Sequence, residues 1–401
     1  MQDVRAGSKQ LIREINQALV IDAVRRERSV SRTEIASMTG LSAPTISGIT
    51  NELIERGLLY EAATGESAGG RKPILLRLNA GAGFVLGVKV TEREAIGVLT
   101  DLDADIVGRA RTKLAGGSEH DVVDAIARLA ARLSKRVDGR PVYGIGVGLA
   151  GVVDRRSGTV RHATYFDWRN VDVAGLVAER TGLPAVIDND INALVANEHL
   201  FRHGRDVDDL LVISLGRGIG LGMVLDGRIH RGALGGAGEF GHVTIDPAGP
   251  DCACGKRGCL EAIVADPALE RRLIEVGSDL DLRTALRSSP DAAEAEFEIF
   301  RDAAAVLGRA ISDLVNVLNP GRIVLTGEGV ELVTATGDIL ADSLRAAVFD
   351  GLADDLETVV QPWKDEDWAR GAAAVLLGDL FQPSFRRNDA LRPTLALAPP
   401  G

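Results

Sequence analysis

Four residues with metal-binding side chains lie close together in the middle of the chain. His242, Cys252, Cys254 and Cys259 fall within 18 residues, and the three cysteines are the only ones in the sequence. Imidazole nitrogen and thiolate sulfur are ligands that zinc prefers, and a set of four leaves no open position, which is typical of a structural site. The spacing H-x9-C-x-C-x4-C differs from that of a DNA-reading zinc finger. The alternative is a group of small buried thiols beside a hydrogen-bonded histidine.

The composition is that of a globular protein with room for two or three domains. The chain has 401 residues, of which 45% are hydrophobic and 26% charged. Because it has no signal peptide and no apolar run of about 18 residues, we expect a cytoplasmic protein without membrane insertion. Reduced cysteines in that compartment suit a metal better than disulfides.

Charge is distributed unevenly along the chain. The net charge is −11, but residues 1–80 contain 11 Lys/Arg and 9 Asp/Glu, a balance of +2, so the remainder carries −13. An acidic chain with a mildly basic N-terminal region does not bind nucleic acid along its whole length. Binding through the N-terminal region alone remains open.

The N-terminal region must position any such contact, and its sequence predicts three helices. Apolar residues at helical spacing predict the first helix over residues 8–27. Ser31 and Glu34 form a capping box at the start of a second, short helix. Ser42 caps a third helix, with Pro44 tolerated in its first turn.

The predicted third helix has an outer face of small and polar side chains. Such side chains let a helix backbone approach base edges in the major groove, so the pattern predicts a helix-turn-helix. Two strand-like runs around a Gly/Ser-rich tip then predict a wing. The predicted DNA contacts are Ser42, Ala43, Pro44, Thr45, Ser47, Arg71 and Lys72. The alternative is a three-helix bundle used for dimerisation.

The rest of the chain predicts a two-lobed α/β body. Glycine-punctuated strands alternate with helices in two similar halves. Helices are predicted over residues 119–137, 191–201, 303–318 and 370–381, and a β-hairpin over F-V-L-G-V-K-V and E-A-I-G-V-L-T-D-L. The predicted domains are 1–80, 81–188 and 189–382, followed by a flexible tail, 383–401.

The N-terminal region, here called the head, and the body together resemble the transcriptional regulators of the ROK family (repressor, open reading frame, kinase) over roughly residues 10–380. The resemblance rests on S-R-T-E-I-A-S-M-T-G-L-S-A-P-T-I-S in the head, and on G-A-G-E-F-G-H (Gly236–His242) and C-A-C-G-K-R-G-C-L-E (Cys252–Glu261) in the body. It implies a winged helix-turn-helix followed by a two-lobed, actin-like body of the sugar-kinase and Hsp70 type. The last helix would return to the first lobe. It also places the histidine and the three cysteines on the family's zinc ligands.

The resemblance further implies a monosaccharide site. Asn189 and Asp190, in D-N-D-I-N-A, fall on the family's sugar-binding pair, and Asp190 falls on the catalytic base of its kinases. The implied sugar contacts are Asn189, Asp190, Glu239, His242, Glu261 and Gly151. Carboxylate and amide groups suit hydroxyls, which both donate and accept hydrogen bonds. Taken singly, these residues would be surface acids or a helix cap. In the glycine loop over the sugar, Ala150 stands where proline is usual.

The phosphate-binding motifs differ from those of the family's kinases. In L-G-V-K-V-T-E-R, Lys89 replaces the aspartate of D-x-G-x-T, and larger residues replace the small ones. The turn G-R-G-I-G-L-G has Arg217 where threonine or serine is usual, and G-E-G (Gly327–Gly329) differs from a glycine-rich adenosine loop. We therefore expect no useful ATP binding and no kinase activity.

These features favour a sugar-responsive repressor of carbohydrate uptake or catabolic genes. It would bind a palindromic double-stranded operator as a homodimer, or as a tetramer. One competing hypothesis is a ROK-type sugar kinase with a fused DNA-binding head. Another is a regulator that a protein partner, such as a sugar transporter subunit, releases from DNA.

Overall fold

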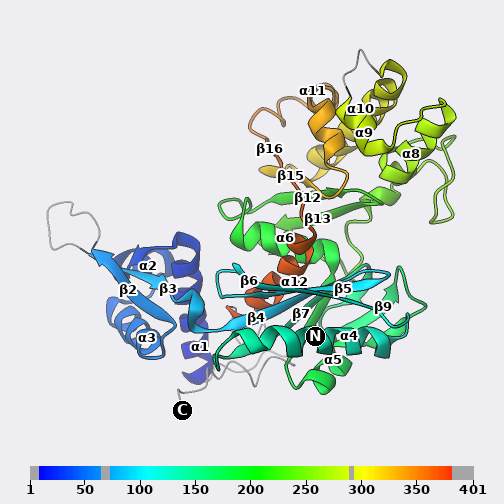
Figure 1. The fold of residues 1–401 in the computed structure, drawn as a ribbon. Coiled ribbons are helices and arrows are strands. Elements are labelled where there is room, and N and C mark those ends of the chain that lie inside the picture. Colours follow the sequence, from blue (N-terminus) through cyan, green and yellow to red (C-terminus); the bar gives the residue numbers. More distant parts are fainter. Residues whose placement is uncertain (1–8, 65–72, 289–292, 382–401) are drawn as a thin grey trace. The chain divides into compact units, whose positions relative to one another are not determined.

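The computed structural model describes residues 9–64, 73–288 and 293–381 (Figure 1). They form two units: unit 1 runs to Phe201 and resumes at Trp368, and unit 2 comprises Arg202–Asp367. This division differs from the boundary expected after residue 188, because α6 (Asp190–Phe201) belongs to unit 1. None of the described helices is both long and apolar enough to cross a lipid bilayer.

The head of unit 1 has three helices and a small antiparallel sheet of strand order β1-β3-β2. Its elements are α1 (Lys9–Glu27), β1 (Val30–Ser31), α2 (Arg32–Thr39), α3 (Ala43–Glu55), β2 (Leu59–Thr64) and β3 (Ile74–Leu78). The tip between β2 and β3 contains Arg71 and Lys72, which lie outside the described residues.

Local capping sets the helix ends of the head as predicted. The Ser31 hydroxyl accepts the backbone N–H of Glu34 at 3.3 Å, and the Glu34 carboxylate accepts that of Ser31 at 2.8 Å. Gly40 ends α2 with a φ of 68°, a left-handed conformation that glycine adopts without strain. The Ser42 hydroxyl accepts the N–H of Thr45 and so starts α3.

A five-stranded mixed sheet forms the body of unit 1, in the order β11-β7-β4-β5-β6. Its strands are β4 (Phe84–Val90), β5 (Glu94–Thr100), β6 (Ile106–Lys113), β7 (Val142–Leu149) and β11 (Ala185–Asn189). β4, β5 and β6 are antiparallel, whereas β7 and β11 run parallel to β4. The hairpin β4–β5 was predicted and β6 was not.

Helices cover both faces of this sheet, with α4 (Glu119–Leu133) and α5 (Val173–Thr181) on one side and α12 (Asp365–Leu380) on the other (Figure 1). Gly87 and Gly146 are paired in β4 and β7. A Cβ at either glycine would lie less than 2 Å from a carbonyl oxygen of α12. These glycines therefore let α12 pack directly on the sheet backbone.

A second, small sheet of unit 1 has the strand order β10-β9-β8. Its strands are β8 (Gly151–Asp154), β9 (Thr159–Ala163) and β10 (Arg169–Asp172). The predicted tail, 383–401, lies outside the described residues.

Unit 2 is built on another five-stranded sheet, in the order β14-β13-β12-β15-β16. Its strands are β12 (Leu210–Leu215), β13 (Ile219–Leu225), β14 (Arg228–Ile229), β15 (Arg322–Thr326) and β16 (Glu357–Val360). The helices are α7 (Leu260–Val264), α8 (Asp266–Glu275), α9 (Leu282–Arg287), α10 (Glu294–Leu318) and α11 (Glu331–Ala347). Their apolar faces and β12, β13 and β15 form one core. The helix predicted from residue 303 begins earlier, at Glu294.

Candidate functional site

The four predicted metal ligands come together in unit 2. Their ligand atoms all lie within 4.8 Å of one another. Cys252 Sγ is 3.6 Å from His242 Nδ1, and Cys254 Sγ is 3.7 Å from Cys259 Sγ. Ligands at zinc bond lengths on the corners of a tetrahedron stand about 3.6–3.8 Å apart. The residues present therefore fit a tetrahedral zinc ion.

The backbone around this cluster is closely packed. His242 ends a short 3-10 turn, and Cys259 directly precedes α7. Gly258 has a φ of 64°, and a Cβ there would lie 1.5 Å from the carbonyl oxygen of Asp246. Lys256 Nζ donates to the carbonyl of His242 at 2.5 Å. These contacts fix the path of the loop that carries the ligand atoms.

The thiols of this cluster differ in their surroundings. Burial raises the pKa of the Cys259 thiol to about 11, and hydrogen bonds with the neighbouring sulfurs add to the effect. A hydrogen bond from the Lys256 backbone lowers the pKa of the exposed Cys254. A buried thiol becomes a thiolate most readily beside a cation, which is the role that a metal ion plays in such a site.

Glu261 and Glu239 border the cluster but differ in their contacts. Glu261 Oε2 accepts the backbone N–H of Ile219 at 3.1 Å, so this carboxylate binds the turn between β12 and β13. Glu239 is exposed and directly precedes the 3-10 turn of His242. Because Nδ1 of His242 faces Cys252, its Nε2 is the nitrogen left for another partner.

A second carboxylate binds the same turn. Glu328 Oε1 accepts the backbone N–H of Arg217 at 3.0 Å. A Cβ at Gly216 would lie 2.3 Å from Glu328 Cγ, so the glutamate lies directly against the turn. Backbone N–H groups of such glycine turns bind phosphate oxygens in nucleotide sites. Two of these donors are taken here by side chains of the protein itself.

Asn189 lies at the junction of β11 and α6 in unit 1. Its Oδ1 accepts the backbone N–H of Ile191 at 2.8 Å and that of Asn192 at 3.3 Å, which caps α6. Its Nδ2 donates to the carbonyl of Gly151 at 2.9 Å. Gly151 has a φ of 141°, and a Cβ there would lie 2.2 Å from the carbonyl oxygen of His162. The structure thus brings Asn189 and Gly151 into direct contact.

Asp190, the first residue of α6, forms an ion pair with Lys89 of β4. Both side chains are largely buried, at 13% and 10% exposure. The Lys89 ammonium also lies 4.7 Å from the centre of the Trp368 ring, a cation–π distance. The sequence pointed to Lys89 as a departure from the kinase motif but did not predict its partner, which is 101 residues away.

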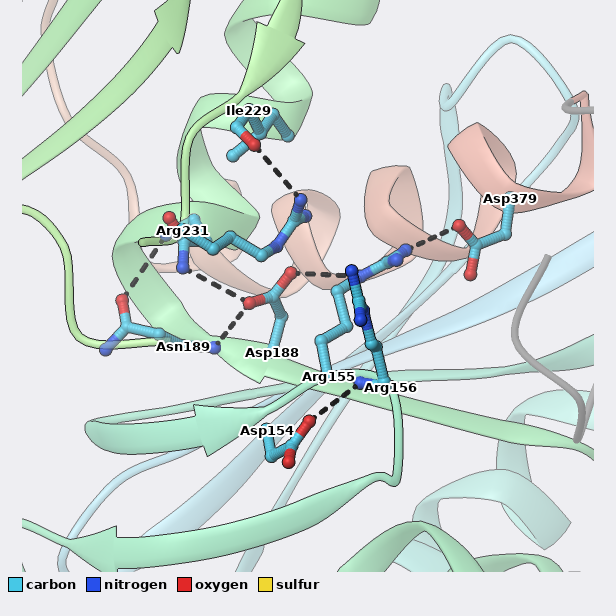
Figure 2. A network of polar contacts seen from close by, with 9 residues as sticks. Asp154, Arg155, Arg156, Asp188, Asn189, Ile229, Arg231 and Asp379 are labelled. Atoms are coloured by element: carbon cyan, nitrogen blue, oxygen red, sulfur yellow. Dashed lines mark hydrogen bonds and ion pairs between the residues drawn. The ribbon is translucent and has the colours of Figure 1, made fainter. Parts of the chain in front are cut away.

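A buried ion cluster lies at the end of β11, next to Asn189 (Figure 2). Arg155 lies between Asp188 of β11 and Asp379 of α12, with Nε 3.2 Å from one carboxylate and Nη2 2.5 Å from the other. Burial opposes its charge, but the two carboxylates outweigh it and raise the pKa of Arg155. Asp188 Oδ1 also accepts the N–H of Asn189 at 2.9 Å. Sequence reasoning missed this cluster.

The predicted DNA-contacting residues of α3 mostly face solvent. Ser42, Ala43, Pro44 and Ser47 are exposed, and Thr45 is half-buried. The hydroxyls of Ser42 and Thr45 are 2.8 Å apart. The opposite side of α3 packs into the head through Ile46, Ile49 and Leu53, whereas Ile54, predicted to be buried, is half-buried.

Two family models match the chain. The ROK family model matches residues 85–378, and the model of the IclR helix-turn-helix domain matches residues 18–62. The chain therefore belongs to the ROK family and carries a helix-turn-helix near its N-terminal end.

Curated relatives match over nearly the whole chain. A putative xylose repressor of Caldicellulosiruptor sp. (strain Rt8B.4) is 31% identical, with 94% of this chain and 98% of the relative covered. The DNA-binding transcriptional dual regulator NagC of Escherichia coli (strain K12) is 28% identical, with coverages of 85% and 86%.

Solved structures confirm the predicted fold class. A ROK family transcriptional regulator, a homologue of the E. coli MLC protein, superimposes with a TM-score of 0.79 at 25% identity and covers 96% of this chain and 98% of its own. A ROK family glucokinase from Streptomyces griseus, in complex with glucose and AMPPNP, gives a TM-score of 0.62 at 27% identity, with coverages of 73% and 99%. The fold is mixed α/β, with a winged helix-turn-helix before an actin-like body of the sugar-kinase type.

Proposed function

We propose that this chain is a sugar-responsive transcriptional regulator that represses genes of carbohydrate uptake or catabolism. One observation carries the proposal: a helix-turn-helix precedes a ROK body whose phosphate turn is bound by its own carboxylates. The names of the relatives, which are repressors linked to xylose and a regulator of transcription, support the same assignment.

The head would bind a double-stranded operator through α3. The small exposed residues at its start, Ser42, Ala43, Pro44 and Ser47, would allow close approach to base edges, with Thr45 beside them. Arg71 and Lys72 of the wing would contact phosphates or the minor groove. A palindromic operator requires two heads, so the active form would be a homodimer, or a tetramer built from dimers.

The body would bind a monosaccharide. The proposed sugar contacts are Asn189, Asp190, Gly151, Glu239, His242 and Glu261. Carboxylates and amides recognise a sugar through its hydroxyls, and a site of this kind rejects ligands that lack a hydroxyl. The contact between Asn189 and Gly151 supports a shared role for these two residues.

A structural zinc ion would be held by His242, Cys252, Cys254 and Cys259. Two pairs of ligand atoms stand at the spacing of a tetrahedral site, and all four atoms lie within 4.8 Å of one another, which supports this assignment. Zinc would fix the orientation of His242, whose remaining nitrogen could then meet a sugar oxygen or Glu239. The metal would stabilise the local fold around these four residues rather than take part in a reaction.

The competing function is ATP-dependent phosphorylation of a hexose, which the similarity to a glucokinase favours. Two contacts oppose it. Lys89 pairs with Asp190, which would have to accept the proton of the attacking hydroxyl. Glu328 and Glu261 occupy backbone donors that nucleotide phosphates would need. We expect no ADP release on glucose, N-acetylglucosamine or xylose in a coupled assay, and measurable turnover would favour the kinase.

The response to sugar would be a shift between two conformations of the dimer. Sugar would bind one conformation more tightly, and in that conformation the two heads would no longer match the spacing of the operator half-sites. Couplings of this kind typically amount to about 1–3 kcal/mol.

A thermal-shift screen against a panel of monosaccharides tests the sugar site. A bound sugar stabilises the folded protein by mass action, so the effector should raise the midpoint of unfolding. Substitution Asn189→Ala should abolish that rise. If no monosaccharide raises the midpoint but a transporter subunit releases the protein from DNA, the regulator responds to a protein instead.

A further inference from the structure

Helix α6 connects two regions of unit 1 that the proposed function has to couple. Its first residue is Asp190, of the proposed sugar pair, and this residue is held by Lys89. Its last two residues, Leu200 and Phe201, both contact Arg25 of the head helix α1. At about 1.5 Å per residue, a helix of this length separates its two ends by about 18 Å.

Arg25 caps α6 from the head. Its Nη1 donates to the carbonyl of Leu200 at 2.6 Å, and its guanidinium carbon lies 5.7 Å from the centre of the Phe201 ring. The last carbonyls of a helix have no partner within the helix and carry partial negative charge, so a buried guanidinium is well suited to that position. Nη2 is bound in turn to Asp22 of α1 at 2.7 Å, which fixes the side chain in place.

The contact is buried, unlike most arginine contacts on a protein surface. The Arg25 side chain is only 5% exposed, whereas that of its neighbour Arg26 is 47% exposed and pairs with the same Asp22 at 3.0 Å. A buried charge that loses its partner is costly, so the head and the end of α6 are expected to move together.

The helix between these ends is packed on all sides. Its residues Asn192–Glu198 are all buried. A Cβ at Gly371 of α12 would lie 2.5 Å from the carbonyl oxygen of Ala193, so the two helices are in backbone contact. A tightly packed helix shifts as a unit rather than deforming along its length.

We propose that Arg25 is the positioning residue that links the orientation of the head to the state of the sugar pair, through α6. A change in the contacts of Asp190 displaces α6, and Arg25 transfers that displacement to α1. This inference rests on the proposed function, because it concerns the response of operator binding to the sugar site.

A double-mutant cycle in operator affinity tests the link without requiring a known sugar. The full-length protein is used to select a binding duplex from random DNA, and its affinity is measured by fluorescence anisotropy. The variants are Lys89→Met, Arg25→Gln and the double substitution. Removing the lysine frees Asp190, so Lys89→Met should change the operator dissociation constant at least about fivefold when Arg25 is present. In the Arg25→Gln background the same substitution should change it less than about twofold.

Arg26→Gln is the matched control, because it removes a charge from the same turn of α1 and from the same aspartate. In that background Lys89→Met should keep its full effect. A folding defect in Arg25→Gln would obscure the result, so Arg25→Lys is measured as well. This variant keeps the charge but loses the two guanidinium nitrogens that contact Leu200 and Asp22. It should also weaken the coupling while its thermal midpoint stays near that of the wild type.

Equal effects of Lys89→Met in the Arg25 and Arg25→Gln backgrounds would overturn the proposal, as would no effect in either. In both cases, if the protein still binds its selected DNA, the proposed function stands. A protein that selects no DNA sequence would contradict the proposed function, and this coupling with it.

Discussion

Glu328 and Glu261 accept backbone N–H groups of the turn between β12 and β13. In a nucleotide site those donors face phosphate oxygens, which carry the same charge as a carboxylate. The turn is therefore satisfied without a nucleotide, and an incoming phosphate would have to displace one or two acids. At the scale of single residues, the body would keep a sugar site while losing the site of the phosphoryl donor.

His242 gives the sharpest residue-scale prediction, because it would serve both the metal and the sugar. His242→Ala should lose bound zinc and the sugar-dependent rise in unfolding midpoint together. Glu239→Ala should lose only the sugar-dependent rise in midpoint, because Glu239 does not contribute one of the clustered ligand atoms. Zinc is measured with a chromogenic chelator after unfolding, and the midpoint by thermal shift. Loss of zinc from Glu239→Ala would refute this separation of roles.

Arg155 gives a second residue-scale prediction, on stability. Arg155→Met leaves the buried carboxylates of Asp188 and Asp379 without their shared partner, which typically costs about 3–5 kcal/mol of unfolding free energy. The neighbouring Arg156 is exposed, so Arg156→Met should cost less than about 0.5 kcal/mol. Urea unfolding followed by circular dichroism compares the unfolding free energies of the two variants. Equal losses would show that the ion cluster does not contribute to stability.

At the scale of elements, the helix ends of the head depend on caps within a few residues of each other. The pKa of Glu34 is lowered by hydrogen bonds from Ser31, with the backbone N–H first and the hydroxyl second. The stabilisation this provides is therefore complete above the unfolded pKa of the carboxyl. It is lost as the pH falls through the lower folded value.

Ser31→Ala should open α2 more often, because it removes the N-cap. A cap of this kind contributes about 1 kcal/mol, which corresponds to about fivefold less protection of the α2 amides in hydrogen exchange. The advantage of the wild type over Glu34→Gln should shrink as the pH falls below about 4.5. Unchanged protection in Ser31→Ala would mean that packing of Ile35 alone holds α2 in place.

Thr45→Ala tests the DNA-binding role of α3 separately from its folding. Thr45 is half-buried and its hydroxyl meets that of Ser42, so the substitution should leave the fold intact. We expect operator affinity to fall about fivefold or more, as for the loss of one base contact. Glu55, at the other end of α3, provides a control in Glu55→Gln, and equal affinities in both variants and the wild type would argue against the assignment.

The sequence predicted those features whose signals are local. The capping box of Ser31 and Glu34 spans three positions, and the four metal ligands lie within 18 residues. β6 was missed because its inward positions include Gly108 and Ala110, whose small side chains give little apolar signal.

The features that were missed join distant parts of the chain. The pair Lys89–Asp190 spans 101 positions, and the contact of Arg217 with Glu328 spans 111. Lys89, Arg217 and the G-E-G turn that contains Glu328 were recognised from the sequence as departures from the kinase motifs. What they contact depends on which strands are neighbours in the sheet, and only the fold determines that.

At the scale of the whole molecule, the proposed function requires that the sugar site and the operator-binding head influence each other. Thermodynamic linkage makes this influence reciprocal, so operator DNA should weaken sugar binding by the same factor by which sugar weakens operator binding. The head and the body of unit 1 meet at the contact of Arg25 with Leu200, which provides a physical path for the effect.

The most direct measurement is the affinity of the full-length protein for its selected operator, with and without saturating monosaccharides. Fluorescence anisotropy is measured with xylose, glucose and N-acetylglucosamine in turn. We predict that one sugar weakens operator binding by about 5- to 150-fold, and that Glu239→Ala, which changes an exposed residue outside α6, abolishes this effect while leaving sugar-free affinity unchanged. Operator binding that is the same in the presence of every sugar would contradict the central claim.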